Sequence, residues 1–95
     1  MQPVDRLFLA VNCPDCAIVK GEMSYGAALD HEYRGRDGQE LRVFTAGCDS
    51  ATRDLLDTYG LKENYTPVMK THRGNVIDEP TEIIEYLREN GMTEH

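Results

Sequence analysis

The order of apolar and polar positions predicts alternating strands and helices from the first residues onward. Residues Arg6–Asn12 form a short apolar run, whose length suits a buried strand better than a helix. Pro14 then fits the first turn of a helix, where its missing N–H group costs nothing. An apolar residue recurs every four positions behind it and gives that helix one apolar stripe: Val19, Met23 and Ala27. We expect the helix to end near Leu29–His31.

The middle of the chain predicts a loop, a second strand and a second helix. Residues Asp30–Glu40 are polar and contain two glycines, which indicates a loop with room for a short edge strand. Residues Leu41–Ala46 alternate and include Val, Phe and Thr, so they favour a strand. The break at Gly47–Ser50 offers a helix N-cap, and Gly60 suits the position after the last turn of that helix.

The C-terminal third predicts a hairpin followed by a helix. Residues Thr66–Lys70 and Asn75–Asp78 are short extended runs on either side of Arg73-Gly74, a natural turn sequence. Pro80 opens a third helix, which Gly91 ends. The apolar face of this helix consists of Ile83, Ile84 and Leu87.

This order of elements predicts a single α/β domain over residues 1–95. The first strand, the crossover helix and the second strand form a right-handed unit with parallel strands, and the hairpin adds two antiparallel strands. We therefore expect the order β-α-β-α-β-β-α and a mixed four-stranded sheet with helices on both faces.

Composition excludes several classes of function. The chain has 95 residues and 17 acidic against 10 basic side chains, a formal charge of −7, so it has no overall basic footprint for nucleic acid. No apolar run approaches the roughly 18 residues that a membrane span needs. We expect a cytoplasmic protein that binds neither nucleic acid nor a membrane.

Two of the three cysteines carry the strongest chemical signal. An odd count argues against a secreted scaffold held by disulfides. Cys13-Pro14-Asp15-Cys16 lies between a predicted strand and a predicted helix. A redox dithiol needs one thiol at a helix N-terminus, where free N–H groups stabilise the thiolate, and a second thiol one turn later. Cys13 and Cys16 meet these two conditions.

Two other interpretations of the cysteine pair stay open. A tetrahedral zinc site normally needs four Cys or His ligands, and Cys48 with His31, His72 or His95 offers no recognised spacing. Two small buried cysteines without a chemical role are the third interpretation. In the redox interpretation, Cys13 is the more exposed thiol and attacks the substrate, and Cys16 resolves the mixed disulfide.

Several nearby side chains have a structural and a functional interpretation. Asp15 either favours the positive helix end and points to solvent or opposes the thiolate by repulsion. Cys48 is either a small residue at a helix start or a regulatory thiol. We expect His72, near the hairpin turn, to be exposed, and most tyrosines, Tyr86 among them, to serve packing or the surface.

Cys13-Pro14-Asp15-Cys16 and the later Thr66-Pro67 together resemble the glutaredoxin branch of the thioredoxin superfamily. The resemblance covers about residues 6–90. It implies a thioredoxin-like fold, a cis peptide bond before Pro67, and a backbone at Thr66 that pairs with an extended substrate. It also implies substrate or glutathione contacts at residues within these motifs or near them: Pro14, Asp15, Tyr65, Thr66, Pro67 and Asp78.

The resemblance implies a thiol–disulfide oxidoreductase in cell redox homeostasis, a monomer with no bound cofactor. Its clients are protein or glutathione mixed disulfides, with ribonucleotide reductase as one client by family analogy. Ala10 stands where the family usually has a cation for a glutathione carboxylate, so glutathione and a thioredoxin-reductase-type flavoenzyme both stay open as reductants. The alternative function is a binding module of the same fold that holds a metal, an iron–sulfur cluster or a protein partner.

Overall fold

The computed structural model describes residues 3–10, 13–23, 26, 32–46, 57 and 66–93. Seven elements lie in these ranges: β1 (Val4–Ala10), α1 (Pro14–Glu22), β2 (Tyr33–Arg34), β3 (Glu40–Ala46), β4 (Val68–Lys70), β5 (Val76–Ile77) and α3 (Pro80–Glu89). Among them, no helix has the length and apolar character needed to cross a membrane.

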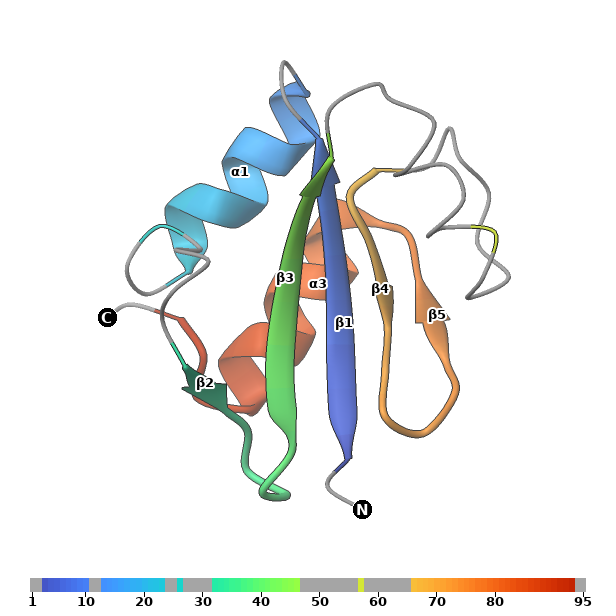
Figure 1. The fold of residues 1–95 in the computed structure, drawn as a ribbon. Coiled ribbons are helices and arrows are strands. Elements are labelled where there is room, and N and C mark those ends of the chain that lie inside the picture. The colour runs from blue at the N-terminus through green and yellow to red at the C-terminus, as the bar shows by residue number, and fades with distance from the viewer. Residues whose placement is uncertain are drawn as a thin grey trace.

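The strands form one mixed sheet in the order β2-β3-β1-β4-β5, with β1 at its centre (Figure 1). β1 pairs in parallel with β3, as the crossover predicts, and antiparallel with β4. The expected four-stranded sheet is wrong, because β2 adds a fifth strand along the outer edge of β3. The polar segment that contains β2 still supplies two buried side chains, Tyr33 and Gln39, and their burial favours its joining the sheet.

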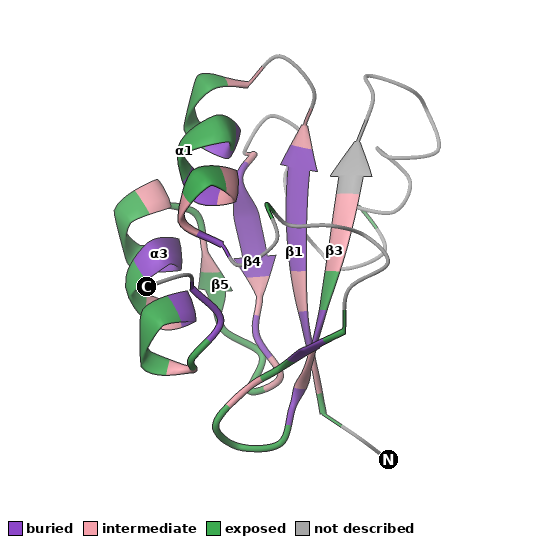
Figure 2. Cartoon of the chain, turned by 90° about the vertical axis from the view of Figure 1, so that its left-hand side faces the viewer, coloured by how far each residue is buried: buried purple, intermediate pink, exposed green. Residues whose placement is uncertain are grey.

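Both described helices cover the same face of the sheet (Figure 2). Leu7 and Leu9 of β1 point toward them and share one apolar core with Val19 of α1 and with Ile83 and Leu87 of α3. Helices on both faces were expected. The helix predicted between Ser50 and Gly60, which would supply the second layer, lies outside the described residues except for Asp57.

Helix α1 is shorter than the apolar stripe predicts. It ends at Glu22 because Met23 turns to an extended backbone, with its N–H donating to the carbonyl of Lys20. Met23 is buried and forms an isolated β-bridge with Thr93, near the other end of the chain. The expected end at Leu29–His31 is therefore wrong, since α1 ends at Glu22 and Met23 pairs with Thr93 instead of continuing the helix.

The last helix follows its sequence signals closely. α3 begins with Pro80 in its first turn and buries Ile83, Ile84 and Leu87 on one face. Gly91 lies just beyond it with φ +73°, a left-handed conformation that glycine adopts without strain. The predicted start, core face and end of this helix are confirmed.

A buried carboxylate joins β1 to two distant parts of the chain. Asp5 is fully buried in β1, and it accepts hydrogen bonds from the His72 backbone N–H (2.6 Å) and the Tyr86 hydroxyl (2.9 Å). The Nδ1 atom of His72 lies 2.7 Å from the same carboxylate. The expectation that His72 is exposed is wrong, since only 12% of its side chain is accessible. Three partners compensate the desolvation of a charged group in the core.

Replacing Tyr86 by Phe tests this arrangement. The change leaves a buried carboxylate with one donor fewer, so we expect the free energy of unfolding to fall by about 1–3 kcal/mol. Chemical denaturation followed by circular dichroism measures the loss. Arg88→Gln is the control, because Arg88 forms a half-exposed ion pair with Glu22 and its loss should cost only about 0–1 kcal/mol. Equal small losses in both variants would contradict a stabilising role for the Tyr86 hydroxyl.

Candidate active site at the start of helix α1

Cys13 forms the N-cap of helix α1. Its backbone is extended, and Pro14 follows as the first helical residue. The backbone N–H of Cys16 donates to the Cys13 sulfur over 3.2 Å. A sulfur at this position receives a free N–H group of the first helical turn and lies at the positive end of the helix dipole.

Cys16 occupies a different environment, one turn into the helix. Only 1% of its surface is accessible, and its sulfur accepts a hydrogen bond from the backbone N–H of Ala10 (3.3 Å). Burial, followed by the hydrogen bond with Cys13, raises the pKa of the Cys16 thiol to about 11. Cys16 is therefore held as a neutral, inaccessible thiol, whereas Cys13 is half-buried at the surface.

Thr66 lies against the dithiol, just before strand β4. The Cys13 sulfur lies 3.5 Å from the backbone carbonyl of Thr66 and 4.0 Å from its hydroxyl. The peptide bond between Thr66 and Pro67 is cis, which confirms the isomer that the resemblance implies. β4 continues from Pro67 antiparallel to β1, and this pairing places Thr66 beside the end of β1.

The other expected site residues differ in where they lie. Pro14 and Asp15 are exposed in the first turn of α1, which fits an Asp15 that points to solvent. Asp78 is exposed after β5, and among the described residues it has no hydrogen bond or ion pair with either cysteine. Tyr65 lies outside the described residues, as does Cys48.

The two sulfurs differ in their accessibility to solvent. Both thiols are free, and only Cys13 reaches the surface, beside a backbone carbonyl at which an extended chain can pair. This arrangement suits attack by one thiol and resolution by the other. Within the described ranges, no three His, Cys, Asp or Glu side chains gather in a way that could hold a metal ion.

Comparisons with protein-family models, with curated proteins and with solved structures found no match for the chain. Assignment of a function therefore depends on the residues and geometry described above.

Sequence reasoning missed the backbone partner of Cys16 and the whole cluster around Asp5. Ala10 carries no chemical signal, because its contribution is a main-chain N–H group. Asp5 did leave a signal, since it shares a strand face with Leu7 and Leu9 by the alternation of side chains along β1. A carboxylate on the core-facing side of a strand requires buried donors, although the sequence does not say which ones.

The raised pKa of Cys16 predicts selective alkylation of the reduced protein. At pH 8 a thiol with a pKa of about 11 has about a hundredfold less thiolate than one at the ordinary 9.0. Iodoacetamide should therefore modify Cys13 and spare Cys16 in the folded protein, with Cys16 labelling rising about tenfold per pH unit up to about pH 11. Fragmentation mass spectrometry separates the two sites. Labelling in denaturant is the control, and equal rates for both cysteines in the native state would contradict the prediction.

Proposed function

We propose that the chain is a glutaredoxin-like thiol–disulfide oxidoreductase with a thioredoxin-like fold. The observation that carries the proposal is the position of the Cys13 sulfur, which caps helix α1 and lies 3.5 Å from the Thr66 carbonyl. The parallel β1–β3 pair, the antiparallel β4–β5 hairpin and α3 support the fold. The buried Cys16, one turn away, supports a two-thiol mechanism.

The reaction consists of two exchanges that balance without a further oxidant. The Cys13 thiolate attacks one sulfur of a substrate disulfide, forms a mixed disulfide and releases the first substrate thiolate. Cys16 then loses its proton, to solvent or to the thiolate released in the first exchange, and attacks the Cys13 sulfur, which releases the second substrate thiolate. The substrate gains two electrons, and the protein is left with a Cys13–Cys16 disulfide. A thiol or dithiol reductant restores both cysteines.

The substrates of this proposal are disulfides that reach the surface at Cys13. Protein mixed disulfides and glutathione mixed disulfides both fit, since pairing at the Thr66 backbone does not depend on substrate side chains. Glutathione and a flavoenzyme dithiol are the two candidate reductants. Asp15 is exposed beside the dithiol and Ala10 supplies no cation, so the described part of the site offers little to attract the glutathione carboxylates.

Serine variants of the two cysteines test the proposal. We expect Cys13→Ser to reduce the rate of insulin and mixed-disulfide reduction to the uncatalysed rate, because the attacking sulfur is lost. Cys16→Ser should instead accumulate a stable mixed disulfide on Cys13, since no second thiol resolves it. Intact-mass spectrometry detects this adduct, and the insulin assay with dithiothreitol measures turnover.

Cys48→Ser is the matched control and should retain wild-type turnover. Turnover that persists in Cys13→Ser would refute the proposal, as would a Cys16→Ser protein that forms no adduct with an excess of disulfide. Supplying either glutathione with its reductase or a thioredoxin-reductase-type flavoenzyme in the same assay then identifies the class of electron donor.

A further inference from the structure

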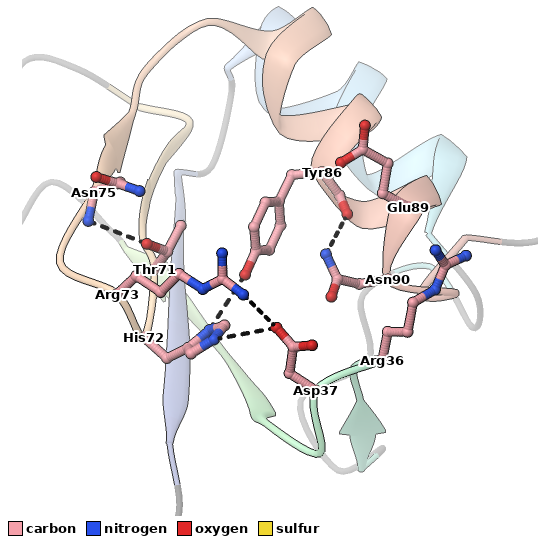
Figure 3. Close-up of a pocket in the computed structure, with 9 residues that line it drawn as sticks. All are labelled: Arg36, Asp37, Thr71, His72, Arg73, Asn75, Tyr86, Glu89 and Asn90. Atoms are coloured by element: carbon pink, nitrogen blue, oxygen red, sulfur yellow. Dashed lines mark hydrogen bonds and ion pairs between the residues drawn. The ribbon is translucent and has the colours of Figure 1, made fainter.

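A polar pocket of about 240 Å³ lies away from the cysteines, at the opposite end of β1 (Figure 3). Its walls come from three segments that are distant in sequence. Arg36 and Asp37 belong to the turn between β2 and β3, residues 71–75 form the turn between β4 and β5, and Tyr86 and Glu89 come from α3. None of these residues takes part in the dithiol chemistry.

Buried polar groups hold the walls of this pocket in place. Gln39 is fully buried, accepts a hydrogen bond from the Asp37 backbone N–H (2.9 Å) and donates to the Asn90 side chain (2.8 Å). Gly35 lies against it so closely that an added Cβ would be 2.2 Å from the Gln39 side chain, so a larger residue there would force that side chain to move. On the other wall, Asp5 fixes His72 and Tyr86. The pocket is thus pre-organised.

One carboxylate oxygen of the protein lies between an arginine and a histidine side chain in this pocket. The Oδ2 atom of Asp37 is 3.0 Å from an Arg73 guanidinium nitrogen and 3.6 Å from Nε2 of His72. The opposite ring nitrogen, Nδ1, faces Asp5. The Asp37 side chain is about half exposed, with 48% of its surface accessible, so it can leave this position without moving the core.

Further donors line the same pocket without a partner in the described part of the chain. Neither the Arg36 guanidinium nor the Asn75 side-chain amide makes a hydrogen bond or ion pair there. Figure 3 shows them on opposite sides of the Asp37–Arg73 pair. The carboxylate of Glu89 is also unpaired within this part, and together with Asp37 it opposes a negative ligand.

We propose that this pocket binds a small oxyanion, a carboxylate or phosphate group, at the position that the Asp37 carboxylate occupies in this structure. The Arg73 guanidinium is the primary contact, because it is planar and matches the geometry of carboxylate and phosphate oxygens. Asn75 and Arg36 line the same pocket on either side of this position, so they can contact the rest of a ligand that is larger than the oxyanion itself. The ligand has to displace Asp37, so binding is weak for a free ion and stronger for a molecule with further contacts.

Glu89 makes the pocket selective for the charge of its ligand. A carboxylate that lines the same pocket disfavours a doubly charged anion more than a singly charged one. Substitutions of the side chains that attract the ligand and of those that repel it should therefore change its affinity in opposite directions. Removing the negative charge of Asp37 or Glu89 should strengthen binding, and removing the positive charge of Arg73 should weaken it.

A titration followed by ¹⁵N-resolved NMR tests the proposal on the intact chain. The probes are inorganic phosphate and acetate, each compared with chloride at equal ionic strength. We expect saturable shifts of the amides of residues 71–75 in the wild-type protein, with tighter binding in Asp37→Asn and in Glu89→Gln. Arg73→Gln should lose binding, whereas Arg88→Gln, which removes a half-exposed arginine outside the pocket, should keep it. Cys13→Ser should bind as the wild type does, which separates this inference from the proposed redox function.

The two probes distinguish the class of ligand. Saturation by phosphate alone assigns a phosphate group, and saturation by acetate alone assigns a carboxylate. The proposal fails if neither ion produces more than the chloride response, or if Arg73→Gln and Arg88→Gln bind alike. Binding confined to Asp37→Asn also overturns it, because the native carboxylate is then a permanent occupant.

Discussion

The pairing of β1 along both of its edges is the constraint on which the rest of the structure depends. β1 is held by β3 in parallel and by β4 in the antiparallel sense, so neither its register nor its direction is free. Its carboxyl end leads directly to the start of α1, and its amino end carries the buried Asp5. One strand thereby positions two polar clusters at opposite ends of a small core.

At the carboxyl end of β1, the two cysteine sulfurs accept hydrogen bonds from different backbone N–H groups. Cys13 receives an N–H group from the first turn of α1, and Cys16 receives one from the last residue of β1. Burial then adds to the contrast, since Cys16 shares the apolar core with Leu7 and Leu9. Two identical side chains three residues apart thus differ in exposure, and burial is the largest cause of the raised pKa of Cys16.

The sequence predicted those parts of the fold that local signals specify. The start of α1 at Pro14 and the end of α3 before Gly91 depend on capping chemistry within a few residues, and both are confirmed. The end of α1 depends on a bridge between Met23 and Thr93, which no local pattern contains. In the candidate site, the motif identified the cysteines and Thr66, but the donor to Cys16 is a main-chain group of Ala10.

The cluster around Asp5 shows why the remaining contacts could not be predicted from the sequence. A charge on the inward face of a strand is visible in the alternation of Asp5, Leu7 and Leu9, yet its partners come from positions 67 and 81 residues later. The register of the sheet and the packing of α3 determine which residues lie next to Asp5, and spacing in the sequence does not reveal them. Because the same cluster fixes the β4–β5 turn and the end of α3, the polar pocket and the core share their supports. Stability and any binding at that end are therefore coupled, whereas the dithiol, at the far end of β1, is supported by other contacts.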